Sequence, residues 1–207
     1  MEEEDFGEEI PCKVILVGDS GVGKTSIIYR YLNKIPEKLK PTIGATFVQK
    51  IELIDNYHIS FDIWDTAGQE RFKAINNIFY KETYVCILVY DITNPETFEN
   101  IKSYWYNCVK TNAPTEIIFV VVGNKIDLYE EEKVDEEKVK EYCESIDAIF
   151  QITSAKQNTY IDELFSKIGK KFINSNLFKN ILSSNTDTKK QKLELGDKNE
   201  KTKKKCC

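Results

Sequence analysis

Short apolar runs recur along the chain, and each has about the length of one β-strand. The runs are residues 13–17, which open on Lys13, and the uninterrupted 84–90 and 117–122. Strands that are buried on both faces of a parallel sheet show this continuous pattern. Residues 58–64 instead alternate apolar with polar side chains, as a half-buried strand does, and residues 48–54 precede them across a turn at 55–57. These two segments therefore predict a β-hairpin.

Segments with helical spacing lie between these strands. The predicted helices cover residues 26–32, 95 to about 111, 135–146, and a segment that opens near 159. Asn94 and Pro95 form a good helix start, because Asn caps a first turn and Pro fits the first helical position. A short strand is expected at 149–152. Strands that alternate with helices predict the α/β class, here a mostly parallel six-stranded sheet with one antiparallel edge strand and helices on both faces.

Charge is unevenly divided along the chain. The net charge of the 207 residues is −5, although residues 179–207 contain nine Lys and four acidic residues. An acidic body with a basic tail is not typical of a nucleic-acid-binding protein, but it suits a tail that meets an anionic membrane surface. From about Asn176 the composition becomes too polar to form a core, so we expect residues 176–207 to be a disordered tether.

The start of the chain gives no sign of export or of membrane insertion. Its sequence MEEEDFGEE is acidic and lacks an apolar segment, so we expect no secretory signal. Glu2 excludes N-myristoylation, which requires Gly at that position, and the chain has no run of 18 apolar residues. Four cysteines show no metal-ligand spacing and are expected to be reduced thiols of a cytosolic protein: Cys12, Cys86, Cys108 and Cys143.

One glycine-rich segment, GDSGVGKT at residues 18–25, carries the clearest chemistry. It reads GxxxxGK[ST] and lies between a predicted strand and a predicted helix, which is the context that this phosphate-binding motif requires. Glycines let the main chain approach a phosphate, successive amides form an anion nest, and the helix dipole adds positive potential. Lys24 can reach the outer phosphates, and the Thr25 hydroxyl can bind Mg²⁺.

A second motif, DTAG at residues 65–68, follows the alternating strand. Asp65 can hold Mg²⁺ directly or through water, and the Gly68 amide can reach a terminal phosphate. The next residue, Gln69, could orient an attacking water. Behind a phosphate-binding loop, this motif predicts part of the same site.

Two further motifs predict the base that is bound. NKID at residues 124–127 places the Asp127 carboxylate where it can accept hydrogen bonds from guanine N1–H and the 2-amino group. Adenine has neither donor, and a site of this kind can discriminate by roughly 10⁴-fold. The segment Ser154-Ala155-Lys156 follows the next strand and could add an N–H for the guanine oxygen.

Together, these motifs resemble those of a small GTPase. Within that superfamily the chain resembles the Rab family, through IGATF (43–47), WDTAGQERF (64–72), VYDIT (89–93) and the terminal Cys206-Cys207. The resemblance extends over about residues 10–175. It implies the P-loop GTPase fold and a GTP/GDP switch that hydrolyses GTP slowly and regulates vesicle traffic. IGATF favours the early-endosomal subgroup.

The resemblance also implies a role for each motif residue. Mg²⁺ would be held by Thr25, Thr42 and Asp65, and Gln69 would position the attacking water. The nucleotide would be bound by Ser20, Gly21, Val22, Gly23, Lys24, Thr25, Ser26, Thr42, Gly68, Asn124, Lys125, Asp127, Ser154, Ala155 and Lys156.

The implied partners are an exchange factor, a GTPase-activating protein, a dissociation inhibitor, a prenylation escort and effectors. Effectors would contact three exposed aromatic residues, Phe47, Trp64 and Tyr80. Geranylgeranyl groups on Cys206 and Cys207 would anchor the protein to the cytoplasmic face of endomembranes, with a cytosolic pool. The expected domains are an acidic extension at 1–10, a GTPase domain at 11–175 and the tail at 176–207.

The chain departs from the family pattern in two places. Ile35 and Pro36 stand where the family usually has an aromatic residue that stacks on guanine, and residues 79–83 lack the usual Arg-Gly. Two other functions are compatible with a phosphate-binding loop: a metabolic kinase or ATPase, and a nucleotide-binding scaffold without hydrolysis. A kinase would need an Arg-rich lid, which is not visible in the sequence, and Gln69 argues against a scaffold.

Overall fold

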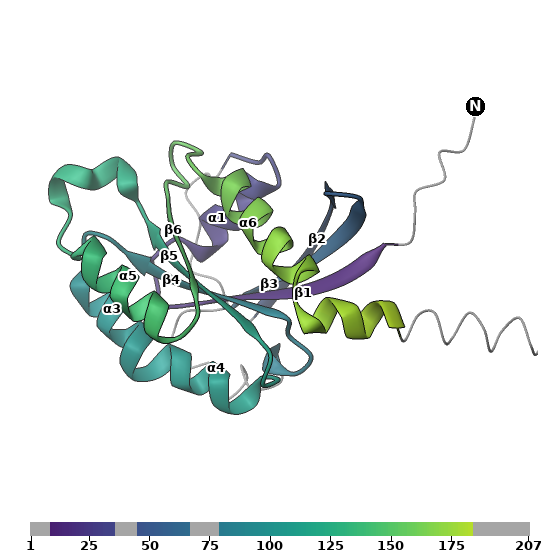
Figure 1. Ribbon diagram of the computed structural model, residues 1–207. Coiled ribbons are helices and arrows are strands. Elements are labelled where there is room, and N and C mark those ends of the chain that lie inside the picture. The colour runs from purple at the N-terminus through teal and green to yellow at the C-terminus, as the bar shows by residue number, and fades with distance from the viewer. Residues whose placement is uncertain (1–8, 36–44, 67–78, 184–207) are drawn as a thin grey trace, which may run out of the picture. The chain divides into compact units, whose positions relative to one another are not determined.

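A six-stranded sheet organises the chain, as Figure 1 shows. The computed structural model describes residues 9–35, 45–66 and 79–183. The strand order is β2-β3-β1-β4-β5-β6, in which β2 runs antiparallel to β3 and every other neighbouring pair is parallel. The strands are β1 Ile10–Val17, β2 Ala45–Ile54, β3 Tyr57–Thr66, β4 Val85–Asp91, β5 Ile118–Asn124 and β6 Ile149–Thr153. The predicted α/β sheet with one antiparallel edge strand is therefore confirmed.

The apolar runs form the centre of this sheet. Every residue of β4 and of β5 is buried, as expected for parallel strands that are covered on both faces. Both strands continue past their apolar runs, so that Asp91 and Asn124 are their last residues and lie in register with each other. Polar side chains are thereby placed at the carboxyl edge of the sheet.

Helices cover both faces of the sheet (Figure 1). They are α1 Lys24–Tyr31, α3 Pro95–Asn100, a π-turn η2 Ile101–Trp105, α4 Tyr106–Asn112, a 3-10 helix η3 Ile126–Glu131, α5 Glu136–Ser145 and α6 Ile161–Ile173. The Asn94 side chain accepts the Glu96 N–H and Pro95 opens α3, as the sequence predicted. The single helix predicted from residue 95 to about 111 is interrupted by the π-turn.

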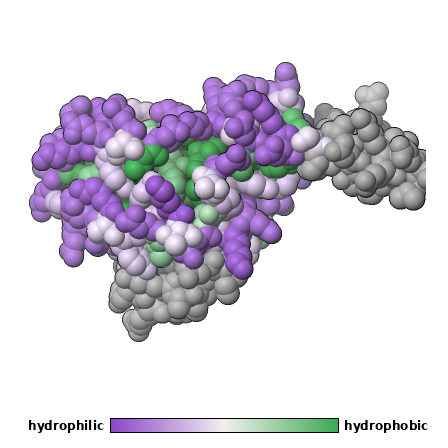
Figure 2. Space-filling model, turned by 60° about the horizontal axis from the view of Figure 1, so that its bottom comes forward, coloured by the Kyte–Doolittle hydropathy of each residue, from purple (hydrophilic) through white to green (hydrophobic). Residues whose placement is uncertain are grey.

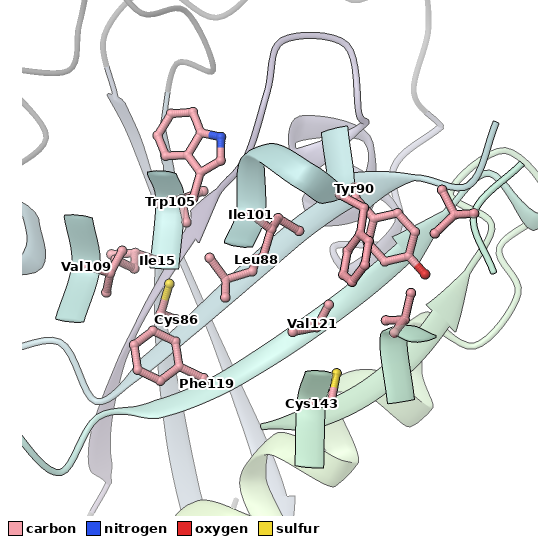
Figure 3. Packing of buried hydrophobic residues seen from close by; sticks show 14 of the residues in the cluster. Ile15, Cys86, Leu88, Tyr90, Ile101, Trp105, Val109, Phe119, Val121 and Cys143 are labelled. Carbon is pink, nitrogen blue, oxygen red and sulfur yellow. The ribbon is translucent and has the colours of Figure 1, made fainter. Parts of the chain in front are cut away.

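Two apolar clusters fill the space between the sheet and its helices. On one face, α3, η2, α4 and α5 pack on β4 and β5 around Tyr90, Trp105 and Cys143 (Figure 3). On the other face, the Tyr31 ring of α1 stacks on Phe165 of α6 with centroids 3.5 Å apart. The surface in Figure 2 is mostly hydrophilic, with hydrophobic residues gathered in a band across the middle of that view.

The structure corrects one of the three predicted effector-contacting aromatics. Tyr80 is fully buried, with 0% of its surface exposed, and joins the core cluster around Trp105 instead of the surface. Phe47 is 49% exposed on the edge strand β2, as predicted. Trp64 is half-buried, because its ring packs between Phe47 and Phe79, with centroids 5.2 Å from each.

The segment that follows α6 is also more ordered than its composition suggested. Residues 176–183 are helical, and the Ser175 hydroxyl accepts the Phe178 N–H at 3.3 Å. Leu177, Phe178, Ile181 and Leu182 recur with helical spacing, a local signal that the polar average of the tail conceals. The predicted tether beyond residue 183 lies outside the described residues.

The described residues test one smaller expectation, the state of the cysteines. The four cysteines within them, at positions 12, 86, 108 and 143, are free thiols, as expected. No helix in the described part of the chain is both long enough and apolar enough to span a bilayer.

Candidate nucleotide-binding site

The carboxyl edge of the sheet gathers most of the motif residues that the structure describes. The glycine-rich loop follows β1, Asp65 is in register with Leu16 near the end of β3, and Asn124 at the end of β5 is in register with Thr153 at the end of β6. In open α/β sheets, ligands bind outside the carboxyl ends of the strands. The topology therefore brings motifs from distant parts of the sequence to one site.

The glycine-rich loop fits tightly between β4 and β5 because two of its positions have no room for a side chain. Gly18 has φ +143°, and a Cβ there would lie 2.2 Å from the Val89 carbonyl oxygen. Gly23 has φ +102°, and a Cβ there would lie 2.2 Å from the Asn124 side-chain nitrogen. Only glycine combines these backbone angles with such close approach.

Helix α1 begins directly after this loop, and its first turn suits an anion. Gly23 is its N-cap and makes no side-chain capping bond, and no acidic residue lies in the first turn. The first N–H groups of a helix have no intrahelical partner, and the helix dipole makes this end positive. The amides of Lys24, Thr25 and Ser26 therefore offer a phosphate-binding turn.

Lys24 is held inside the loop that precedes it. Its Nζ donates hydrogen bonds of 2.8 Å to the carbonyl oxygens of Gly18 and Asp19, and only 5% of its surface is exposed. Burial lowers the pKa of Lys24 to about 8, although the charges of Asp65 and Asp19 act in the opposite direction. The ammonium group is therefore mostly protonated at neutral pH and provides a positive charge at the centre of the loop.

Thr25 and Asp65 come together from α1 and β3, as the predicted magnesium site requires. The Thr25 hydroxyl donates a 2.6 Å hydrogen bond to Asp65 Oδ2, and Asp65 is buried. A hydroxyl and a carboxylate are the hard oxygen ligands that Mg²⁺ prefers. These two residues fit the predicted metal, whereas the third predicted ligand, Thr42, lies outside the described residues.

Asn124 connects two loops with one buried side chain. Its Nδ2 donates to the Val22 carbonyl at 2.8 Å, and its Oδ1 accepts both the Ala155 N–H and the Thr153 hydroxyl at 3.2 Å. All four residues are buried. These hydrogen bonds join the phosphate-binding loop to the loop after β6, and the contact with the base that the resemblance implied for Asn124 stays a prediction.

The Asp127 carboxylate is held in a fixed orientation beside that loop. Its Oδ1 accepts a 2.6 Å hydrogen bond from the Ser154 hydroxyl, and only 6% of its side chain is exposed. The exposed Lys156 ammonium lies 3.6 Å from Asp127 Oδ2. The structure therefore orients the Asp127 carboxylate, and its predicted contact with guanine stays a prediction.

Lys125 is fixed by a carboxylate that the sequence had not assigned a role. Lys125 has a left-handed backbone, with φ 74°, and its Nζ forms an ion pair with Asp91 at the end of β4. Burial of Asp91 would raise its pKa, but hydrogen bonds from Lys125 and Thr93 outweigh this effect and lower it. Asp91 therefore stays charged and orients Lys125.

Arg30 was also missed from the sequence. From the last turn of α1, its Nε and Nη2 donate 2.7 Å hydrogen bonds to the carbonyl oxygens of Ala155 and Lys156. A guanidinium fork is well suited to two neighbouring acceptors. The sequence around Arg30 does not indicate this role, because its partners lie 125 and 126 residues further along the chain.

The remaining predicted residues divide into two groups. Ser20 and Gly21 are exposed on the phosphate-binding loop, Val22 is buried beneath it, and Ser26 is half-buried in the first turn of α1. The others lie outside the described residues, where their roles stay predictions: Thr42, Gly68, Gln69, Cys206 and Cys207. Two residues stand where the family usually has an aromatic residue that stacks on guanine. Of these, Ile35 is 74% exposed, and Pro36 also lies outside the described residues.

Fold and site together define a P-loop nucleotide-binding protein, and comparisons with known proteins specify its kind. Residues 13–174 match the Ras family. The chain is 43% identical to Ras-related protein Rab-22A of Homo sapiens over 160 residues, which are 77% of this chain and 82% of that protein. It is 42% identical to the Ypt/Rab-type GTPase YPT7 of Saccharomyces cerevisiae over 171 residues, which are 79% and 82% of the two chains.

A third relative is Ras-related protein RabJ of Dictyostelium discoideum. The identity is 43% over 162 residues, which are 78% of this chain and 63% of that protein. The chain therefore belongs to the Ras family, as a GTPase of the Rab type. Its activity is GTP hydrolysis, and the family predicted from the motifs is confirmed.

Proposed function

We propose that the protein is a switch of vesicle traffic that binds GTP with Mg²⁺, hydrolyses it slowly, and recruits effectors to endomembranes in the GTP form. The observation that carries guanine recognition is the Asp127 carboxylate, which is nearly buried and oriented by Ser154. Guanine satisfies it with two donors, whereas adenine leaves it unpaired in a site with little access to water. The Rab-type relatives support the cellular role.

The phosphates lie on the loop after β1 and on the first turn of α1. The amides from Ser20 to Ser26 and the Lys24 ammonium bind them, because they combine unpaired N–H groups with a positive charge. Thr25, Asp65 and Thr42 would hold Mg²⁺, which would supply positive charge to the phosphate oxygens when bound. The Gly68 amide meets the terminal phosphate.

Hydrolysis in this proposal depends on Gln69, which orients the attacking water toward the terminal phosphate. GTP orders the segments around Thr42 and Gly68, and loss of the terminal phosphate releases them. Exchange factors, activating proteins and effectors act on these two states. The effector-contacting residues are Phe47 and Trp64, since aromatic side chains are enriched at protein interfaces.

The bound nucleotide tests this mechanism directly. We expect wild-type protein purified without added nucleotide to release mainly GDP on denaturation, and Gln69→Leu to release mainly GTP, because leucine cannot align water. Mass spectrometry of the released nucleotide measures both. Adenine nucleotide in the wild type would contradict the proposed base, and equal GTP hydrolysis rates in both proteins would remove Gln69 from the mechanism.

Membrane attachment depends on the end of the chain. Geranylgeranyl groups on Cys206 and Cys207 supply two anchors, which stable binding requires, and the neighbouring Lys203, Lys204 and Lys205 add roughly 1 kcal/mol each near an anionic surface. A dissociation inhibitor and a prenylation escort handle these lipid groups, which gives the protein a cytosolic pool.

Removal of both terminal cysteines is expected to abolish membrane attachment. Cys206→Ser with Cys207→Ser leaves only the basic residues to bind the surface, so the protein should move from the membrane pellet to the cytosolic fraction while its GDP content is unchanged. Cell fractionation and intact mass measure this. A double variant that still pellets, or a wild type that carries no lipid, would contradict the anchor; Cys108→Ser is the matched control.

A further inference from the structure

The π-turn between α3 and α4 gives this helix an unusual geometry. Within Ile101–Trp105 the backbone changes from i→i+4 to i→i+5 bonding, and the Tyr106 N–H donates to the Ile101 carbonyl. Single π-turns inside α-helices often occur at functional sites. This one lies next to the phosphate-binding loop and contacts it through side chains.

Two side chains at the ends of the π-turn, from the residue before it and from its last residue, bind one carboxylate of that loop. Asn100 Nδ2 donates to Asp19 Oδ2 at 2.7 Å, and Trp105 Nε1 donates to Asp19 Oδ1 at 2.8 Å. In a regular α-helix, residues five apart point about 140° away from each other. The wider i→i+5 turn reduces this divergence, and here both donors reach the same carboxylate.

Asp19 also takes part in holding Lys24. Its backbone carbonyl accepts a 2.8 Å hydrogen bond from Lys24 Nζ, while its side chain is fixed by the helix. The Trp105 ring is 2% exposed and packs in the core cluster, with its nitrogen turned away from Cys86 and Val109 in Figure 3. The core thus fixes the indole, the indole fixes Asp19, and Asp19 fixes the start of the loop.

We propose that Asn100 and Trp105 are positioning residues, which hold the phosphate-binding loop through Asp19 and thereby slow the release of bound GDP. The proposal rests on the proposed placement of the phosphates on this loop. A loop that is held in its binding geometry loses less conformational freedom when nucleotide binds. Loss of the anchor therefore raises the rate at which nucleotide leaves.

The release rate of GDP tests this role. Wild type and variants are loaded with fluorescently labelled GDP, and release is followed after addition of excess unlabelled GDP. Trp105→Phe keeps a ring in the core but removes the donor, and we expect roughly 10-fold faster release, as for loss of one hydrogen bond to a charged group. Tyr104→Phe is the matched control: it removes a hydroxyl from the same turn that accepts a hydrogen bond from the Cys108 thiol, and release should stay at the wild-type rate.

A double-mutant cycle separates positioning from packing. In an Asp19→Ala background, Trp105→Phe should change release by less than about twofold, because the acceptor is already gone. The same acceleration in both backgrounds would show that the indole acts through the core and would overturn the proposal. Asn100→Ala provides the same test at a half-buried position if Trp105→Phe does not fold.

Two further results are decisive. Wild-type release rates in both Trp105→Phe and Asn100→Ala would overturn the anchor. A wild-type protein that retains no labelled GDP would instead contradict the proposed nucleotide site, so the two failures are distinguishable.

Discussion

Asp127→Asn is expected to change the preferred base from guanine to xanthine. The wild-type carboxylate accepts two donors of guanine, whereas the amide of Asn presents a donor that clashes with the guanine 2-amino group and matches the xanthine oxygen. Because the side chain is only 6% exposed and its Oδ1 is fixed by Ser154, water cannot replace the lost hydrogen bonds. Affinity for GDP should fall by roughly 10³- to 10⁴-fold, and XDP should become the preferred ligand.

Competition binding with GDP and XDP measures this change. Asp135→Asn is the matched control, because Asp135 caps α5 with the same chemical group and Asn caps a helix equally well. It should leave the base preference unchanged. An Asp127→Asn protein that still prefers GDP would remove Asp127 from the base site.

Asn124→Ala is expected to cause the largest loss of stability. The substitution removes the donor for the Val22 carbonyl and the acceptor for the Ala155 amide and the Thr153 hydroxyl. Each buried group left without a partner costs about 1–3 kcal/mol, so the free energy of unfolding should fall by about 3 kcal/mol or more. GDP release should accelerate as well, since the phosphate-binding loop and the loop after β6 are no longer joined.

Urea unfolding in the presence of saturating GDP, together with the GDP release rate, measures both effects. Asn112→Ala is a suitable control, because its side chain donates one local hydrogen bond to Cys108 within α4. That variant should lose about 1 kcal/mol or less and release GDP normally. A stable Asn124→Ala protein with normal release would show that the connection between the loops is dispensable.

Much of the fold could be predicted because it is encoded by local patterns. The continuous apolar runs give β4 and β5, and the alternation of apolar and polar residues gives β3. Signals of this kind depend on neighbours within a few residues. The π-turn was missed because Ile101–Trp105 has the composition of an ordinary helix, and the change in hydrogen bonding is visible only in three dimensions.

The site residues also divide into those that local sequence patterns identify and those that only the three-dimensional structure shows. Motif spacing identified Lys24, Asp65 and Asp127, since their chemistry requires particular residues in fixed order. Arg30 and Trp105 could not be found in this way, because they act on partners 125 and 86 residues away. Tyr80 was assigned to the surface for a related reason. The residues that follow it in the sequence are polar, and they do not indicate that its side chain is buried.

The hairpin of β2 and β3 has a mechanical consequence. Its ten residue pairs run from Ala45 opposite Thr66 to Ile54 opposite Tyr57, about 30 Å of continuous strand. A slip of one residue would turn Ile59, Phe61 and Ile63 out of the core, so the two strands cannot slide past each other. The segments that hold Thr42 and Gly68 join this hairpin at the same end, before Ala45 and after Thr66. The cross-strand pairs therefore hold the start of β2 and the end of β3 in one register, so a displacement of Ala45 along its strand is transmitted to Thr66.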